Sequence, residues 1–127
     1  MVCSYPLFDI LLQSPRNPDH LFDFAMGDSA ANVVISEDRF ALVLDANGTM
    51  LRVTSVQNFK PQQFTILGWD VANIDETVSD LNQRGILFEK YGMAGQDERG
   101  IWKSPSGARV AWFKDPDGNV LSLTQFP

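Results

Sequence analysis

The sequence predicts an α+β fold in which one unit of a strand, a helix and three strands is written twice. The main observation is a repeat: residues 39–54 and 109–124 align without a gap at a separation of 70 positions, and six of the paired residues are identical. A fainter match lies upstream at a separation of 56 positions. A repeat of this length indicates a unit that buries its apolar face against its own copy. We therefore expect one domain, residues 1–127, made of module one, residues 1–58, and module two, residues 62–127.

Each copy of the repeat carries the signature of a β-hairpin. An Asn-Gly pair in the first copy and an Asp-Gly pair in the second separate two apolar stretches. These residue types readily adopt the positive φ angles of a two-residue hairpin turn. With each pair at the tip of its turn, we expect Val43 opposite Arg52 in the first hairpin. In the second hairpin we expect Phe113 opposite Ser122.

The other elements of module one follow from the spacing of its apolar residues. A strand is expected over residues 7–13, because the prolines that follow cannot continue it. From Asp19 the apolar residues fall at helical spacing, which predicts a short helix that ends near Gly27. Residues 32–36 are expected to form the strand that precedes the hairpin.

Module two is expected to follow the same order, with one more strand after the helix. A strand over residues 64–71 leads to a helix with Asp75 as its N-cap and Gly85 at its end. A strand over residues 86–91 and a polar loop over residues 92–100 come next. Three further strands complete the sheet, over residues 101–103, 108–114 and 119–125.

Composition and charge exclude several classes of protein. An apolar fraction of 44% supports a packed core. The net charge of −6 argues against binding to nucleic acid or to an anionic membrane, because clustered Lys and Arg are lacking. The apolar run 7–12 contains Asp9 and no basic segment precedes it, so we expect no signal peptide, no membrane span and a cytoplasmic location. Cys3 is the only cysteine, which excludes an intrachain disulfide, and near a terminus expected to fray it is not expected to act as a nucleophile.

The duplicated βαβββ unit, closed by residues 113–123 with their Asp-Pro-Asp-Gly-Asn segment, resembles the vicinal oxygen chelate superfamily. This superfamily includes glyoxalase I, extradiol dioxygenases and bleomycin- and fosfomycin-resistance proteins. The resemblance covers the chain from Phe40 onward and is weaker before it. It implies two tandem βαβββ modules that form a cup-shaped, partly open mixed β-sheet barrel with the helices outside and a small molecule in the cup. It also implies a homodimer, whereas fold alone does not fix function.

Metal-dependent members of this superfamily place four ligands in the cup, one on the first and one on the last strand of each module. The resemblance maps these positions onto Ile10, Arg52, Ile66 and Ser122. None of the four is a credible ligand for a divalent ion, which prefers imidazole or carboxylate, and a guanidinium repels a cation. The only histidine, His20, falls on the expected first helix, outside the cup. We therefore expect no metal ion and no other cofactor.

Arg52 is the most informative of these positions. The alternation of a strand places Met50, Arg52 and Thr54 on one face. Pointing into the cup, Arg52 can receive a carboxylate, phosphate or other oxyanion with its bidentate fork. The alternative is that it pairs with a neighbouring carboxylate such as Asp70 or extends to the rim.

Further side chains are expected to face the cup by the same alternation. The polar members, expected to supply hydrogen bonds, are Ser122, Thr124 and Asp70. The apolar members, expected to enclose an aliphatic or aromatic body, are Val43, Ile66 and Phe113. Gly68 either lets a ligand approach closely or allows close packing within the protein.

Aromatic and acidic residues complete the set of candidates. Three residues fall on the opposite face and are expected in the core against the helices: Trp69, Trp112 and Leu123. Tyr91 and Trp102 flank the loop over residues 92–100 and are expected at the mouth of the pocket, or in an ordinary rim or dimer contact. Asp97 and Glu98 in that loop are expected to be solvated charges.

Three functional hypotheses follow. The first is a metal-independent, cytoplasmic glyoxalase-like domain that binds a small, anionic or partly aromatic molecule, with sequestration as its role. The second is a metal-dependent lyase, isomerase or dioxygenase of glyoxalase type whose ligands lie elsewhere. The third is a structural or partner-binding module whose cup is filled by its own side chains. Metal analysis separates the second from the others, and ligand-induced thermal stabilisation separates the first from the third.

Overall fold

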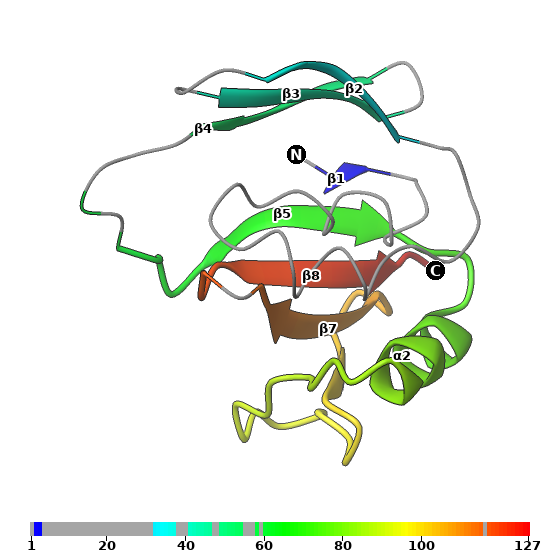
Figure 1. Ribbon diagram of the computed structural model, residues 1–127. Coiled ribbons are helices and arrows are strands. Elements are labelled where there is room, and N and C mark those ends of the chain that lie inside the picture. The colour runs from blue at the N-terminus through cyan, green and yellow to red at the C-terminus, as the bar shows by residue number, and fades with distance from the viewer. Residues whose placement is uncertain are drawn as a thin grey trace. The chain divides into compact units, whose positions relative to one another are not determined.

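The computed structural model describes residues 2–3, 32–37, 41–46, 49–54, 58, 60–115 and 117–127 (Figure 1). The chain divides into two compact units. Unit 1 comprises Pro61–Pro127 together with Met1–Ser4, and unit 2 comprises Tyr5–Lys60. The expected first strand, residues 7–13, and the expected first helix, which includes His20, lie outside the described residues. That the two units form a single domain stays a prediction.

Unit 2 contains a three-stranded antiparallel sheet in the order β2-β3-β4. Its strands are Asn32–Glu37 (β2), Ala41–Ala46 (β3) and Thr49–Thr54 (β4). Ala46 pairs with Thr49, so two residues connect β3 to β4, as the Asn-Gly pair predicts. Val43 pairs with Arg52, which confirms the register expected for the first hairpin.

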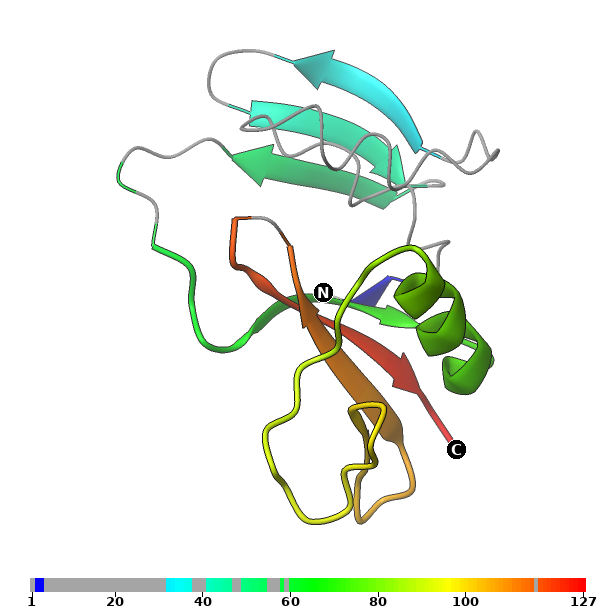
Figure 2. The same cartoon turned by 60° about the horizontal axis from the view of Figure 1, so that its bottom comes forward.

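Unit 1 is built on a five-stranded mixed sheet in the order β1-β5-β8-β7-β6 (Figures 1 and 2). Its strands are Val2–Cys3 (β1), Thr65–Asp70 (β5), Ile101–Lys103 (β6), Arg109–Lys114 (β7) and Val120–Gln125 (β8). β5 runs parallel to both β1 and β8, while β7 is antiparallel to β6 and β8. Cys3 therefore lies in a strand beside Trp69, not in a frayed terminus as expected.

The helix of unit 1, α2, spans Ile74–Gln83 and follows β5 directly. Asn73 is its N-cap, and its side chain accepts a hydrogen bond from the Glu76 amide at 3.2 Å. The expected N-cap, Asp75, instead lies in the first turn, where its charge complements the helix dipole. Gly85, with a φ of 93°, follows the C-cap as expected, because this backbone conformation strains other residues. No helix among the described segments is long and apolar enough to cross a membrane.

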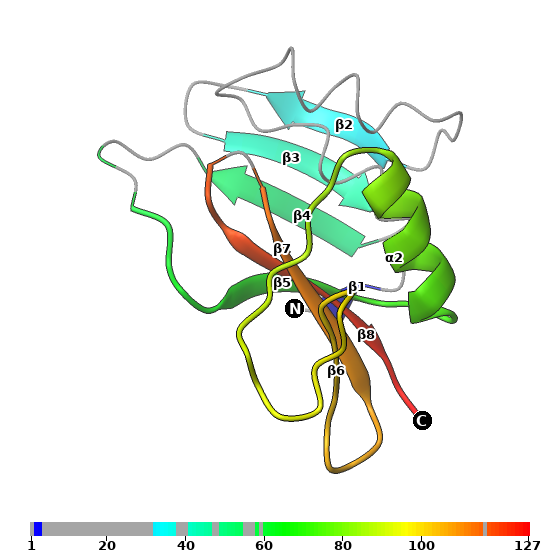
Figure 3. The same ribbon diagram turned by 90° about the horizontal axis from the view of Figure 1, so that it is seen from below.

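Between α2 and β6 the chain forms a long irregular segment instead of the strand expected over residues 86–91 (Figure 3). Phe88 alone forms an isolated bridge, opposite Phe113. The order of module two is thus a strand, a helix and three strands. The segment from residue 89 to residue 100 is held by side-chain hydrogen bonds of Gln96 and Asp97 in place of a regular ladder.

One face of the five-stranded sheet forms the core of unit 1 with α2, which lies against β7 and β8. Ile74, Val78 and Leu81 of α2 are fully buried, and each contributes about 1.5–3 kcal/mol through the hydrophobic effect. The sheet residues on this side are also buried: Trp69, Ala111, Phe113, Leu121 and Leu123. The rings of Trp69 and Phe113 stack at 6.5 Å between centroids. The core positions expected for Trp69 and Leu123 are confirmed.

The second hairpin differs from the first in the length of its loop. Lys114 pairs with Val120, so five residues connect β7 to β8 in place of two. Asp115 closes this loop: its carboxylate accepts hydrogen bonds from the backbone and side-chain amides of Asn119, both at 2.8 Å. Burial raises the pKa of Asp115, against the opposing effect of these hydrogen bonds.

The longer loop reverses two expectations. Trp112, not Phe113, pairs with Ser122, and Phe113 pairs with Leu121. Because directly opposed residues share a face, Phe113 belongs to the core and Trp112 lies on the other side of the sheet. The prediction of Phe113 as a pocket wall and of Trp112 as a core residue was wrong, since a change of one residue in register exchanges the two faces.

Candidate functional site

The face of the five-stranded sheet opposite α2 carries most of the predicted site residues of unit 1. We call it the open face, and its residues include Gly68, Asp70, Trp102, Val110, Trp112, Ser122 and Thr124. Strand pairing arranges them in two rows across the sheet. One row contains Trp102, Val110, Thr124 and Asp70, and the other contains Trp112, Ser122 and Gly68. Neighbours within a row are separated by the strand spacing of about 4.8 Å.

Trp112 covers the centre of the open face. Its indole Nε1 donates a hydrogen bond to Thr65 Oγ1 at 3.1 Å. Trp112 lies on β7 and Thr65 on β5, so the indole crosses β8, which lies between them. Below it, Val120 and Ser122 are only 2% and 7% exposed. The indole therefore forms an apolar surface above the floor of the sheet.

Tyr91 and Trp102 stand beside Trp112 and form an aromatic cluster with it. The Tyr91 ring meets Trp112 edge to face at 5.7 Å between centroids, and Trp102 lies 6.0 Å from Trp112 with the rings tilted by 38°. Tyr91 is 47% exposed. Partial burial, together with the charge of Glu89, raises the pKa of the Tyr91 phenol, which favours its neutral form. The structure thus brings together Tyr91 and Trp102, which were predicted, and Trp112, which was not.

Gly68 and Ser122 lie opposite each other at the floor of the open face. A Cβ atom on residue 68 would lie 2.5 Å from Ser122 Oγ, closer than any normal contact. Gly68 therefore makes room for the Ser122 side chain, which is close packing within the protein. Of the two expectations for this glycine, the geometry supports this one.

The polar end of the open face contains Asp70 and Thr124, which are paired across β5 and β8. Asp70 is exposed, and Thr124 is half-buried. Ile66, at the irregular point of β5, is 44% exposed. Ser122, Thr124 and Asp70 thus share one face, while Ile66 lies at the register shift between Thr65 and Leu67. Contact of these four residues with a ligand stays a prediction.

Arg52 and Val43 belong to the sheet of unit 2. Arg52 is exposed and Val43 is half-buried, and the two are paired across β3 and β4. Met50, on the same side of β4 as Arg52, is also exposed. The role of Arg52 as the partner of an oxyanion stays a prediction.

The loop over residues 92–100 is fastened at both ends by Gln96. Its side-chain oxygen accepts a hydrogen bond from the Tyr91 amide at 2.8 Å. Its side-chain nitrogen donates to the carbonyl oxygens of Glu89 at 3.0 Å and Gly100 at 3.1 Å. Sequence reasoning missed Gln96, since a single glutamine in a polar loop carries no pattern that points to this role.

Asp97 organises the end of the same loop. One carboxylate oxygen accepts hydrogen bonds from the backbone amides of Arg99 and Ile101, both at 2.9 Å, and the other binds the Arg99 guanidinium at 3.0 Å. Partial burial works to raise the pKa of Asp97, but these hydrogen bonds outweigh it and lower the pKa. The expectation of a merely solvated charge at Asp97 was therefore wrong.

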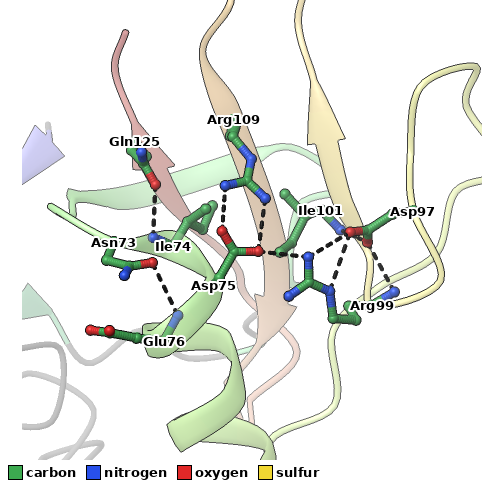
Figure 4. A network of polar contacts seen from close by, with 9 residues as sticks. All are labelled: Asn73, Ile74, Asp75, Glu76, Asp97, Arg99, Ile101, Arg109 and Gln125. Atoms are coloured by element: carbon green, nitrogen blue, oxygen red, sulfur yellow. Dashed lines mark hydrogen bonds and ion pairs between the residues drawn. The ribbon is translucent and has the colours of Figure 1, made fainter.

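An ion-pair network joins this loop to α2 (Figure 4). Asp75 in the first turn of α2 binds Arg109 of β7 and Arg99 of the loop, with one Arg109–Asp75 hydrogen bond at 2.9 Å and the Arg99–Asp75 ion pair at 2.6 Å. Hydrogen bonds from Arg109, and then from Arg99, lower the pKa of Asp75 far below its ordinary value. On the same helix the Ile74 amide donates to Gln125 Oε1 at 2.9 Å, which ties α2 to β8.

The positions that the resemblance assigns to metal ligands do not suit a metal ion. Ile66 offers no donor atom, Ser122 is nearly buried beside Gly68, and Arg52 carries a positive charge. The fourth position, Ile10, lies outside the described residues. Within the described ranges, no group of three or more His, Cys, Asp or Glu side chains is arranged to hold a metal ion. The donor set of the fold family's metal centre is therefore missing at these positions.

No protein-family model and no curated protein sequence matches this chain. Its fold, however, is that of the glyoxalase, bleomycin-resistance and dioxygenase superfamily, as the resemblance of the sequence predicts. A bleomycin resistance determinant encoded on the transposon Tn5 is similar with a TM-score of 0.54 and 18% identity, over 76% of this chain and 79% of that chain.

Two further solved structures are similar at the same level. A glyoxalase family protein from Bacillus anthracis has a TM-score of 0.53 and 17% identity, over 76% of this chain and 74% of that chain. A member of the glyoxalase/bleomycin resistance protein/dioxygenase superfamily from Sphaerobacter thermophilus has a TM-score of 0.51 and 24% identity, over 74% of this chain and 75% of that chain. At these identities the likeness is one of fold, and function has to be argued from the site.

Proposed function

We propose that this protein is a glyoxalase-superfamily domain that binds a small, partly aromatic molecule on the open face, without a metal ion. The observation that carries the proposal is the aromatic cluster of Tyr91, Trp102 and Trp112 on the face opposite α2. Large aromatic side chains are usually buried, and partly exposed ones gathered in one place are typical of ligand sites.

The chemistry of the open face supports a ligand with one flat end and one polar end. The three rings offer faces and edges for stacking, which contributes about 0.5–1.5 kcal/mol for each aromatic pair beyond the burial of area. Thr124 and Asp70 form the neighbouring pair, two residues further along β8 and β5 than Ser122 and Gly68, and can take part in hydrogen bonds. The predicted oxyanion contact of Arg52 belongs to the same proposal, for ligands that carry an anionic group.

Metal-free binding is proposed because the positions that would hold a metal contain unsuitable side chains. The role that we propose is sequestration of the ligand, and the similarity in fold to a bleomycin resistance determinant supports it. The cup formed by two tandem modules, the homodimer and the cytoplasmic location remain parts of this proposal.

Titration with small aromatic probes tests the proposal. Indole, indole-3-acetate and acetate are added to the ¹⁵N-labelled protein, and amide shifts and melting temperatures are recorded. We expect indole and indole-3-acetate to shift the amides of β7, β8 and residues 89–103 and to raise the melting temperature, because ligands of the native state stabilise it. Acetate alone is expected to shift few of these resonances.

Trp112→Phe and Trp112→Ala locate the binding surface, and Leu87→Ala is the matched control because Leu87 is apolar and 82% exposed outside the cluster. We expect Trp112→Ala to weaken indole binding about tenfold or more, the equivalent of about 1.4 kcal/mol, and Trp112→Phe to weaken it less. Unchanged affinity in Trp112→Ala, or binding lost equally in Leu87→Ala, would exclude the open face as the site.

A further inference from the structure

We propose that Gln96 is a positioning residue that holds the loop over residues 91–100 as a fixed wall, so that Tyr91 and Trp102 stand beside Trp112 before any ligand arrives. The inference rests on the proposed function for the identity of the site. The side chain of Gln96 makes no hydrogen bond to any of the three rings. Its hydrogen bonds go to the backbone of the loop that carries Tyr91 and leads to Trp102.

The side chain of Gln96 ties the two stems of the loop to each other. Its oxygen binds the Tyr91 amide, while its nitrogen binds the carbonyl oxygens of Glu89 and Gly100. One carboxamide thus forms hydrogen bonds with three backbone groups, two in the first stem of the loop and one in the second. This arrangement requires an acceptor and a two-proton donor on the same planar group, which only Asn and Gln offer.

The backbone around Gln96 holds the second ring. Gln96 forms a bridge with Trp102, and the Lys103 amide donates to the Gly95 carbonyl at 3.1 Å. The Trp102 indole Nε1 donates to the Ala94 carbonyl at 3.0 Å. Gln96 therefore stands between Tyr91 and Trp102: its side chain holds Tyr91 directly, and its backbone belongs to the segment that holds Trp102.

A second attachment fixes the loop to the rest of unit 1. Asp97 binds Arg99 and the Ile101 amide, and Arg99 reaches Asp75 on α2 (Figure 4). With the Gln96 contacts, the loop is anchored to its own stems, to β6 and to α2. Such a loop acts as a preformed wall and not as a lid, which lowers the cost of ordering these rings when a ligand binds.

The isosteric variant Gln96→Glu tests this role. The carboxylate can still accept from Tyr91, but its second oxygen faces the carbonyl oxygens of Glu89 and Gly100 and repels them. Protonation of that oxygen restores one donor, so the ordered loop favours the protonated form and raises the pKa of the carboxyl. We expect the ordered loop at low pH and its loss as the pH rises through that value.

Three variants are compared at pH 5 and pH 8: Gln96→Glu, Gln96→Leu and, as control, Glu98→Gln, an exposed residue of the same loop that takes no part in this network. The readouts are hydrogen exchange of the Tyr91 amide, the nuclear Overhauser contact between Tyr91 and Trp112, and indole affinity. We expect exchange about tenfold faster in Gln96→Leu at both pH values, since each lost hydrogen bond is equivalent to about two- to tenfold. Gln96→Glu is expected to match it at pH 8 and to recover at pH 5, and Glu98→Gln to behave as the wild type.

Unchanged protection and an intact Tyr91–Trp112 contact in Gln96→Leu would overturn the proposal, as would the absence of any pH-dependent recovery in Gln96→Glu. If Gln96→Leu fails to fold, the pH profile of Gln96→Glu decides alone. Absence of indole binding in the wild type would count against the proposed function, whereas hydrogen exchange and the ring contact still decide the role of Gln96.

Discussion

At the scale of single residues, the pair Gly68 and Ser122 shows how the floor of the open face is packed. A Cβ atom on residue 68 would lie 2.5 Å from Ser122 Oγ but 3.8 Å from Ser122 Cβ. The conflict therefore involves the hydroxyl and not the strand. A side chain at residue 68 is therefore expected to be tolerated once the Ser122 hydroxyl is removed.

We predict that Gly68→Ala lowers the free energy of unfolding by about 1–3 kcal/mol, the usual cost of overpacking. In the Ser122→Ala background the same change is expected to be nearly neutral, because the nearest side-chain contact becomes an ordinary one. Denaturant unfolding of the wild type, both single variants and the double variant gives the coupling energy. Additive effects in this cycle would show that the loss arises elsewhere.

Trp112 shows where reasoning from single residues fails. Its type and its place in an apolar strand are compatible with either face of the sheet, so only the register decides. Asp115 and Asn119 set that register by closing a five-residue loop with their side chains. The sequence contains a signal for this, since the Asp-Pro-Asp-Gly-Asn segment offers polar partners at both ends of the loop, whereas an Asn-Gly turn needs none.

At the scale of secondary-structure elements, the strands and the helix of module two follow from local rules. β5, α2, β7 and β8 lie close to the predicted segments, because strand alternation, helical spacing and Gly85 are local signals. The expected strand over residues 86–91 does not form. The hydrogen bonds of Gln96 and Asp97 that replace it link residues through tertiary structure, which local patterns do not contain.

The attachment of α2 to the sheet predicts a pH dependence. The pKa of Asp75 is lowered from its ordinary value of 3.8 by Arg109 and Arg99. The folded state therefore binds the proton of Asp75 less readily than the unfolded chain, so this contribution to stability is full above about pH 4 and is lost as the pH falls. The Asp75 side chain is 41% exposed, and solvent screening makes the effect modest.

We expect Asp75→Asn to lower the melting temperature at pH 7 and to flatten its decline between pH 4 and pH 2 relative to the wild type. Asp80→Asn, a change of the same charge at an exposed position of α2, serves as the control and is expected to leave the decline unchanged. Melting curves at several pH values measure this. If the melting temperatures of the wild type and Asp75→Asn fall equally steeply between pH 4 and pH 2, the assignment of the pKa shift to this ion pair is contradicted.

At the scale of the whole molecule, the repeat in the sequence predicts the architecture better than any single residue. The similarity of solved structures from the glyoxalase superfamily confirms an α+β fold of glyoxalase type at identities of 17–24%, where pairwise sequence comparison carries little information. The barrel of two tandem modules stays a prediction. The N-terminal pair Val2–Cys3 joins the sheet of unit 1 although the repeat assigns it to module one. Parallel pairing between such distant segments leaves no local pattern in the sequence.

Addition of metal ions tests whether this chain differs from the metal-dependent members of the superfamily that its sequence resembles. Zinc, nickel, manganese and iron(II) are added in turn to chelator-treated protein while the melting temperature is recorded. A metal at one hundred times its Kd would stabilise the native state by about 2.7 kcal/mol, which raises the melting temperature by several degrees in a chain of this size. Because Ile66, Ser122 and Arg52 stand at the mapped ligand positions, we expect no such increase for any of the four ions. A clear increase, with near-stoichiometric metal in the protein purified without chelator, would place the ligands on other residues and favour a metal-dependent enzyme over a sequestering domain.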